Sequence, residues 1–194
     1  MKSVLLSIKP NWCKLIWSGM KTVELRKTRP KLKPPFKVYI YCTEAESWEM
    51  CFPRTGLRQM NGRIIGEFVC RKIDTLVHVG SMGSREPLQL NILTTDGWYK
   101  SADKLLQTAC MSEATAEKYL KGRNGYGWHI SDLEIYDEPV KLKDFWGKRP
   151  CKLGGDCQNC LQWYLDRAKC DEIIECISRP PQDWCYAVEK VVLG

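Results

Sequence analysis

Histidine is scarce in this chain of 194 residues, which holds only His78 and His129. Few side chains can therefore exchange a proton near neutral pH. The chain also lacks any stretch of about 18 apolar residues, which excludes a long apolar helix that spans a membrane. The opening MKSVLLSIKP has neither the apolar core nor the small-residue cleavage site of a secretory signal. We therefore expect a cytoplasmic protein that has no membrane partner.

Internal repeats and low-complexity tracts are absent too, and the proportions of hydrophobic residues (44%) and charged residues (27%) are ordinary for globular proteins. A chain of this length can bury one sizeable core, so we expect a single domain over residues 1–194. Cysteine, in contrast, is abundant, with eleven residues. Because cytosolic thiol buffers reverse disulfides, we expect these thiols to be reduced and to serve packing, reactivity or metal binding.

Positive charge is concentrated in one early segment. The formal net charge is +7, and between residues 21 and 37 seven basic residues face a single acid, Glu24. The basic residues of this segment are Lys21, Arg26, Lys27, Arg29, Lys31, Lys33 and Lys37. Prolines stiffen the tract that follows Arg26, so it could lie along a phosphate chain as an extended arm. A solvated loop is the alternative.

Periodicity and punctuation predict several strands and a few short helices. Pro10 and Gly19 are typical of the start and the end of a helix, and β-branched or alternating runs favour strands. The predicted strands are residues 2–8, 22–26, 36–42, 62–73, 127–137 and 184–193, and the predicted helices are residues 10–18, 101–109 and 112–122. Residues 74–98 are interpreted as loop, and Pro139 is expected to end a strand. Because strands and helices do not alternate strictly, we expect an α+β fold: a small mixed β-barrel flanked by short helices.

A cluster of charges lies where the first predicted helix gives way to a strand. Period-two geometry means that burying Val23 and Leu25 aims Glu24 and Arg26 at the opposite side, with Lys21 in the turn beside them. A guanidinium offers a planar fork for phosphate, an amine a point charge, and a carboxylate accepts from base amino groups. The alternative is an exposed strand face with a surface ion pair that contributes at most about 1 kcal/mol.

The segment LSIKPNWCKLIWSGMKTVELRK, residues 6–27, resembles the signature of the ASCH family, part of the PUA-like superfamily. In that signature a strand and a helix lead into Gly-x-Lys-x-x-Glu-x-Arg. Those positions here are Gly19, Lys21, Glu24 and Arg26. YGWHISDLEIYDEP from Tyr126 and RPPQDWCYAVE from Arg179 also resemble segments of prophage-type and bacterial ASCH proteins. The resemblance implies a PUA-like β-barrel whose charged motif lines a cleft.

The resemblance also implies recognition of RNA or nucleotides, so the first hypothesis is a binding module for RNA or a modified nucleotide. Some ASCH proteins are amidohydrolases that act on N4-acetylcytidine, and others are ribonucleases, so the alternative is a hydrolase acting on a nucleoside derivative or on RNA. The amidohydrolases have a nucleophilic threonine where this chain has Glu24, and Thr22 is displaced by two residues, about 6.5 Å on a strand. The two histidines, His78 and His129, do not form a pair of the kind that would suggest RNA cleavage. In an enzyme, Lys21 and Glu24 would transfer protons, whereas in an interaction scaffold they would be silent.

Further residues are predicted around the cleft. Tryptophan is frequent, with eight residues, and flat rings stack on bases while basic side chains follow phosphates. Tryptophans at helical spacing are also commonly buried, and a strand histidine is often satisfied by local hydrogen bonds. We expect Trp128 and His129 opposite the charges, and Lys9 and Trp12 at the rim. The predicted ligand-binding residues are Lys9, Trp12, Lys21, Glu24, Arg26, Trp128 and His129.

A cysteine-rich stretch precedes the last predicted strand, and we interpret residues 147–178 as an insertion. Cys157 and Cys160 form a Cys-x-x-Cys knuckle, whose thiolates could bind one tetrahedral zinc ion. The predicted ligands are Cys151, Cys157, Cys160 and Cys170, with Cys176 as an alternative fourth ligand. Such a structural zinc would staple a short segment that has little core. The alternative is that these cysteines are free, because a zinc ribbon would show a second Cys-x-x-Cys knuckle and this chain has only one.

Overall fold

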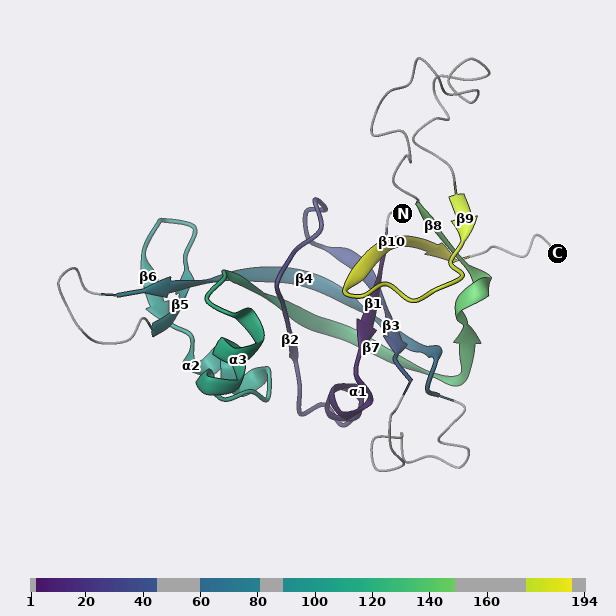
Figure 1. Ribbon diagram of the computed structural model, residues 1–194, viewed down its shortest axis with the longest axis horizontal. Helices are drawn as coiled ribbons and strands as arrows, with labels where there is room; N and C mark the ends of the chain where they lie inside the picture. The colour runs from purple at the N-terminus through teal and green to yellow at the C-terminus, as the bar shows by residue number, and fades with distance from the viewer. Residues whose placement is uncertain (1–2, 45–59, 81–88, 149–173, 190–194) are drawn as a thin grey trace, which may run out of the picture.

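The computed structural model describes residues 3–44, 60–80, 89–148 and 174–189 (Figure 1). These ranges form one mixed sheet and a few short helices. The strands are β1 (Ser3–Ile8), β2 (Val23–Arg26), β3 (Phe36–Cys42), β4 (Arg63–Val79), β5 (Gln89–Leu93), β6 (Tyr99–Ser101), β7 (Gly125–Lys141), β8 (Phe145–Lys148), β9 (Ile174–Cys176) and β10 (Trp184–Glu189). The helices are α1 (Pro10–Trp17), α2 (Asp103–Thr108), α3 (Glu113–Leu120) and a 3-10 turn at Leu142–Asp144. None of the described helices is long and apolar enough to cross a membrane.

The strands follow the order β2-β7-β4-β3-β1-β10-β8-β9, and β5 and β6 form a hairpin that pairs with β4. β1 and β3 run parallel, and the other recorded strand pairs are antiparallel. The mixed sheet with few short helices is therefore confirmed, but the predicted closed barrel is wrong. Among the described strands, this order has two open ends, β2 and β9. The four-residue β2 pairs with β7 alone and β9 pairs with β8 alone, so the two ends do not join.

The first four elements lie where the sequence predicts them. α1 begins at Pro10, and the chain leaves it through Gly19 at φ +75°, a backbone conformation that glycine adopts without strain. α2 and α3 are confirmed with slightly shorter bounds. Ser112 caps α3, since its side chain accepts a hydrogen bond from the backbone N–H of Thr115.

Two predictions about the long strands are wrong. Residues 74–98 are not all loop, because β4 continues to Val79 and its last five residues pair with β5. β7 also runs through Pro139 instead of ending before it. The register of β4 against β7 shifts between Ile64 and Gly66, where β7 bulges, so the missing N–H of Pro139 costs no regular ladder bond.

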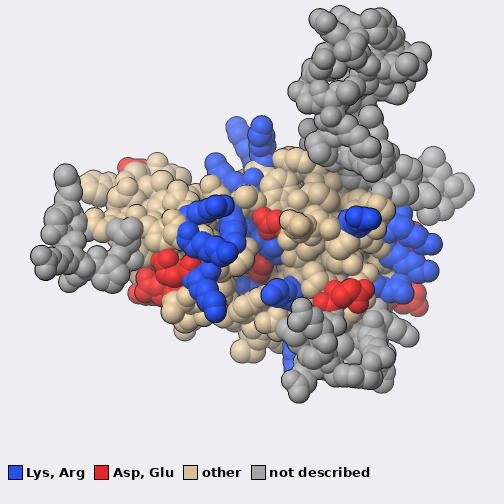
Figure 2. Space-filling view, viewed as in Figure 1, with Lys and Arg blue, Asp and Glu red and all other residues tan. Residues whose placement is uncertain are grey.

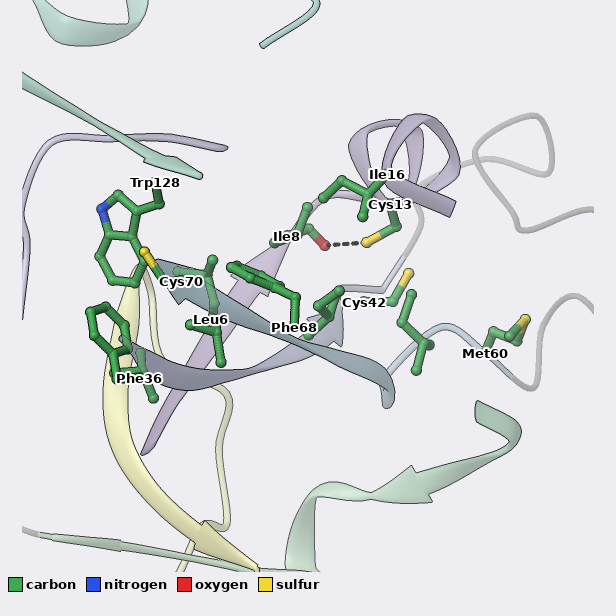
Figure 3. Close-up of a cluster of buried hydrophobic side chains, with 14 residues drawn as sticks. Leu6, Ile8, Cys13, Ile16, Phe36, Cys42, Met60, Phe68, Cys70 and Trp128 are labelled. Carbon is green, nitrogen blue, oxygen red and sulfur yellow. Dashed lines mark hydrogen bonds between the residues drawn. The ribbon is translucent and has the colours of Figure 1, made fainter. Parts of the chain in front are cut away.

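The buried apolar residues of the described chain form three clusters, of which two bear on the site. One cluster lies under α1 and includes Leu6, Ile16, Phe68 and Trp128 (Figure 3). A second cluster joins Val23 and Leu25 of β2 to α2 and α3. The members of that second cluster from the two helices are Leu105, Leu106, Ala116 and Leu120. One face of β2 thus joins an apolar cluster, while its other face carries the buried charges of Glu24 and Arg26.

The predicted cysteine-rich insertion lies mostly outside the described residues. β8 and β9, which flank residues 149–173, pair antiparallel with Trp146 opposite Cys176. The proposed zinc ligands Cys151, Cys157, Cys160 and Cys170 lie outside the described residues. The insertion and the single domain over residues 1–194 therefore stay predictions.

The close approach of β4 and β7 yields a prediction. A methyl group on Gly66 would meet the carbonyl oxygen of Glu134, which is backbone and cannot swing aside. We expect Gly66→Ala to lower the free energy of unfolding by about 1–3 kcal/mol, as overpacking does elsewhere. Urea denaturation measures the loss, with Gln107→Ala on exposed α2 surface as the control. Equal stability of Gly66→Ala and wild type would contradict this account of the contact.

Candidate functional site

The charged residues of β2 and its preceding turn are buried. Lys21 is 2% exposed, Glu24 5% and Arg26 6%. The alternative of an exposed strand face with a surface ion pair is therefore wrong. The backbone at the end of α2 reaches Lys21, and the C-terminal linker, which we define as residues 177–183 between β9 and β10, reaches Arg26.

Lys21 is held from three sides. Its Nζ donates to the carbonyl oxygen of Ala109 at 2.7 Å and lies 3.3 Å from Oε2 of Glu24. The same Nζ lies 4.8 Å from the ring centre of Trp12, so the half-buried ring provides a cation–π contact. The Lys21 amine thus contacts groups from α1, β2 and the end of α2.

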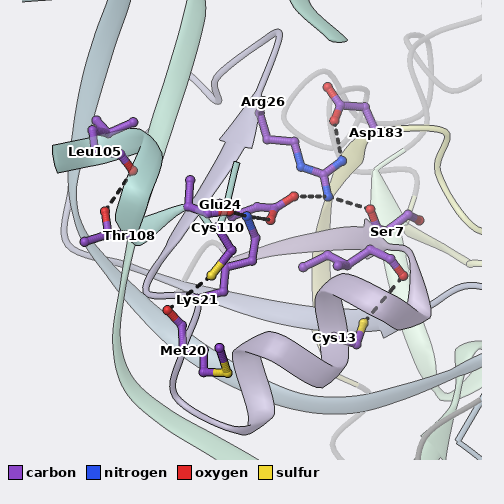
Figure 4. A network of polar contacts seen from close by, with 12 residues as sticks. Ser7, Cys13, Met20, Lys21, Glu24, Arg26, Leu105, Thr108, Cys110 and Asp183 are labelled. Carbon is purple, nitrogen blue, oxygen red and sulfur yellow. Dashed lines mark hydrogen bonds and ion pairs between the residues drawn. The ribbon is translucent and has the colours of Figure 1, made fainter. Parts of the chain in front are cut away.

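Arg26 connects β2 to both ends of the described chain (Figure 4). Its Nη2 lies 3.1 Å from Oε1 of Glu24 and donates to the carbonyl oxygen of Ser7 in β1. Its Nη1 donates to Oδ1 of Asp183 in the C-terminal linker at 2.8 Å. Lys21, Glu24, Arg26 and Asp183 together form what we call the charge network.

The charge network is formally neutral, with two cations and two carboxylates. Burial lowers the pKa of Arg26, but the Glu24 and Asp183 carboxylates raise it, and the net shift is upward, so the guanidinium stays charged. Two buried atoms of the network, Oε2 of Glu24 and Nε of Arg26, have no hydrogen-bond partner among the described residues. Glu24 Oε2 therefore meets Lys21 as an ion pair that lacks hydrogen-bond geometry.

The basic loop, residues 27–35 between β2 and β3, lies beside this network and is not a free arm. Lys27 Nζ is 4.7 Å from the ring centre of Tyr119, and the guanidinium carbon of Arg29 is 5.7 Å from that of Tyr126. The backbone N–H of Lys31 donates to the hydroxyl of Tyr186 at 3.0 Å. Figure 2 shows lysine and arginine side chains gathered near the centre of this face, over β2 and the loop that follows it. The cations of the loop thus lie beside tyrosine rings that α3, β7 and β10 provide.

Trp128 and His129 do not line one surface, contrary to our expectation. In the β2–β7 register Trp128 is opposite Glu24 and His129 is opposite Val23, so the two side chains point to different faces of the sheet. Trp128 is fully buried against Phe36 and Trp184.

His129 lies within hydrogen-bonding reach of β4 and away from the charge network. Its Nε2 is 2.7 Å from Oδ2 of Asp74, which is the local hydrogen bond that the sequence left open as the alternative. Of the predicted rim residues, Trp12 contacts Lys21, and Lys9 is exposed at the start of α1. The structure therefore brings together Trp12, Lys21, Glu24 and Arg26 out of the seven predicted ligand-binding residues.

Sequence reasoning missed the residues that surround Arg26 and complete the network. Asp183 lies 157 positions from Arg26 in sequence, and Thr28 donates from its hydroxyl to Oδ2 of the same carboxylate at 2.8 Å. Trp184 Nε1 in turn donates to that hydroxyl oxygen at 2.8 Å. The segment RPPQDWCYAVE that carries the family resemblance was the available signal, but nothing in it says which residue meets Arg26.

No group of three or more histidine, cysteine, aspartate or glutamate side chains suited to a metal ion occurs in the described part of the chain. The predicted zinc ligands lie outside that part, so structural zinc stays a prediction. Thr22, which the sequence raised as a hydroxyl near the motif, is exposed and contributes backbone bonds to Thr108 and Ile130.

The comparisons with known proteins bear on the fold. No protein-family model matches the chain, and no curated protein matches it either. Among solved structures it is similar to the crystal structure of ASCH from Zymomonas mobilis, with a TM-score of 0.51 and 19% identity over 94% of this chain and 85% of that chain. It is also similar to the crystal structure of a tyrosine-to-phenylalanine mutant of that organism's ASCH protein, with a TM-score of 0.50 and 17% identity over 95% and 88% of the two chains. At these identities the likeness shows the fold alone, which agrees with the ASCH resemblance although the described strands do not close into the barrel that it implied.

Charge compensation in the network yields a prediction for stability. Glu24→Gln keeps the shape of the side chain but leaves Lys21 and Arg26 with one carboxylate fewer in a buried place. We expect it to lower the free energy of unfolding by about 3–5 kcal/mol, the usual cost of breaking a buried pair from one side. The matched control is Asp132→Asn, whose exposed ion pair with Arg71 contributes at most about 1 kcal/mol. If both variants unfolded at the same urea concentration, the network would not be a structural requirement.

The carboxylate beside His129 yields a prediction for pH dependence. Burial raises the pKa of Asp74, but hydrogen bonds from Lys72 and His129 lower it, and the net shift is downward from 3.8. A depressed carboxyl pKa stabilises the fold above the unfolded-state pKa, and this stability is lost as the pH falls through the folded-state pKa. The stability difference between wild type and Asp74→Asn should thus be constant above about pH 5 and shrink below pH 3.8. Urea midpoints measured between pH 2 and pH 7 test this, and a difference that did not change with pH would refute it.

Proposed function

We propose that this chain, which has the fold of the ASCH protein of Zymomonas mobilis, binds RNA or a modified nucleotide. The binding surface would lie over the charge network and the basic loop. The observation that carries the proposal is the arrangement of the loop itself: Lys27 and Arg29 are stacked on tyrosine rings directly beside a buried, charge-compensated strand. Cations that follow phosphates and rings that stack on bases are the two components of sequence-tolerant RNA binding.

The loop would provide the phosphate contacts. Arg29, Lys31 and Lys33 are exposed, and Lys27 is half-buried. Because a ring contacts Arg29 and a backbone bond holds Lys31, this part of the loop loses little backbone freedom when a ligand binds, which favours affinity. The half-buried rings of Trp184 and Tyr186, whose centres lie 5.4 Å apart, would provide the flat surface next to them.

Within this proposal the predicted residues take different roles. The side chains of Lys21, Glu24 and Arg26 are too buried for a ligand to surround them. They would hold the proposed binding surface in place from beneath and contribute only its edge. Trp128 would act from below, as the buried ring against which Trp184 packs at 6.2 Å between ring centres. The exposed Lys9 and the half-buried Trp12 stay proposed rim residues, while His129 faces another part of the sheet.

The test is a binding titration of the full chain with a short single-stranded RNA and a nucleotide panel that includes acetylated cytidines. We expect Arg29→Gln and Lys31→Gln each to weaken RNA binding. Each should also reduce the slope of log affinity against log salt concentration by about 0.7, the value for one lost contact to a single strand. Lys143→Gln, an exposed lysine that precedes β8, removes the same charge away from the loop and should leave both quantities unchanged.

Product analysis of the same mixtures decides between binding and catalysis. Unchanged nucleotides after long incubation would support the binding module, whereas deacetylated cytidine or shortened RNA would show a hydrolase. An absence of RNA and nucleotide binding at low salt would overturn the proposed function.

A further inference from the structure

We propose that Arg26 and Thr28 form a phosphate site that the carboxylate of Asp183 occupies in the free protein. The proposal deepens the proposed function, on which it rests for the source of the phosphate. A phosphate group of RNA or of a nucleotide would bind by displacing the Asp183 side chain.

The geometry around Asp183 is that of a bound anion. Arg26 Nη1 donates to Oδ1 and the Thr28 hydroxyl donates to Oδ2, both at 2.8 Å (Figure 4 shows the arginine contact). Two donors from one short stretch of chain thus bind two oxygens of one carboxylate. Phosphate offers oxygens at similar spacing and accepts charge-assisted bonds from guanidinium in the same way.

The Thr28 hydroxyl is oriented for an anion before any ligand arrives. Trp184 Nε1 donates to its oxygen at 2.8 Å, and an indole nitrogen can only donate. The hydroxyl hydrogen is therefore free to point at Asp183 or at whatever acceptor replaces it. Trp184 consequently reports on the occupant of the site through its indole N–H.

Charge balance favours an anion at this position. Without Asp183 the network would hold Lys21 and Arg26 against Glu24 alone, which leaves one positive charge in a buried place. An uncompensated buried charge is costly, so occupation of the site by the internal carboxylate or by a ligand is favoured. Arg26 Nε, buried and without a hydrogen-bond partner among the described residues, leaves the guanidinium with an unused donor.

Asp183 is also the member of the network that solvent reaches. Its side chain is 31% exposed, whereas those of Arg26 and Glu24 are 8% and 7% exposed. The linker backbone is attached through other bonds, because Ser7 N–H donates to the Asp183 carbonyl oxygen and Ser7 Oγ donates to that of Pro181. The carboxylate can therefore rotate away while the backbone of the C-terminal linker stays in place.

The experiment compares wild type, Asp183→Asn and Asp132→Asn for binding of pyrophosphate, a 5′-phosphorylated RNA and the same RNA without its terminal phosphate. Removing the internal competitor should tighten pyrophosphate and RNA binding by Asp183→Asn roughly tenfold, the value of one charge-assisted hydrogen bond. Asp132→Asn removes the same charge from an exposed pair and should stay near wild type. Adding Thr28→Val to Asp183→Asn should reverse the gain, because it deletes the second donor.

A spectroscopic readout accompanies the binding data. In 1H–15N spectra the Trp184 indole resonance, assigned with Trp184→Phe, should move when wild type binds pyrophosphate and should also move in unliganded Asp183→Asn. Terminal and internal phosphates are distinguished by the two RNAs, since only a terminal site would favour the phosphorylated one.

The outcomes separate this proposal from the proposed function. RNA binding that is unchanged or weakened in Asp183→Asn, with an unmoved Trp184 resonance on ligand addition, would overturn the phosphate site and leave the RNA-binding function standing. Tight pyrophosphate binding by Asp183→Asn without RNA binding would support the site and overturn the function. Binding of none of the three ligands by any variant would overturn both.

Discussion

Compensation of two buried cations is the constraint on which the arrangement of this protein depends. Lys21 and Arg26 lie within a few residues of each other and both are almost fully enclosed, with Glu24 between them. Desolvating a charge without partners costs several kcal/mol, so the chain must bring acceptors to both ends of the cluster. The end of α2 supplies one through Ala109, β1 supplies another through Ser7, and the C-terminal linker supplies Asp183.

β2 can satisfy this constraint because one of its faces is apolar and the other is charged. Val23 and Leu25 enter the apolar cluster beneath α2 and α3, while Glu24 and Arg26 enter the charge network. Since a strand alternates its side chains, four residues are enough to join an apolar core and a polar one. The basic loop begins directly where this doubly anchored strand ends, which fixes the position of its first cations.

Local features were predictable from the sequence and long-range ones were not. Pro10, Gly19 and the alternation around Val23 set the bounds of α1 and β2, and these residues act on their immediate neighbours. The burial of Lys21 depends on α2, which comes some eighty residues later, and charged side chains are normally exposed. The open sheet and the length of β7 depend on pairing, and a bulge that accommodates Pro139 leaves no sign in a single sequence.

The position of β1 has a consequence for how the chain is made. β1 pairs with β3 on one side and with β10 on the other, and β10 is the last of the described strands to be synthesised. During translation β1 leaves the ribosome well before β10, and it keeps an unpaired edge, which is a template for wrong strand pairing, until residues 184–189 emerge. Arg26 likewise lacks the Asp183 carboxylate until 157 further residues have been made. A nascent chain that has not yet reached β10 therefore holds an incomplete sheet and an uncompensated Arg26, and it is most exposed to misfolding during that interval.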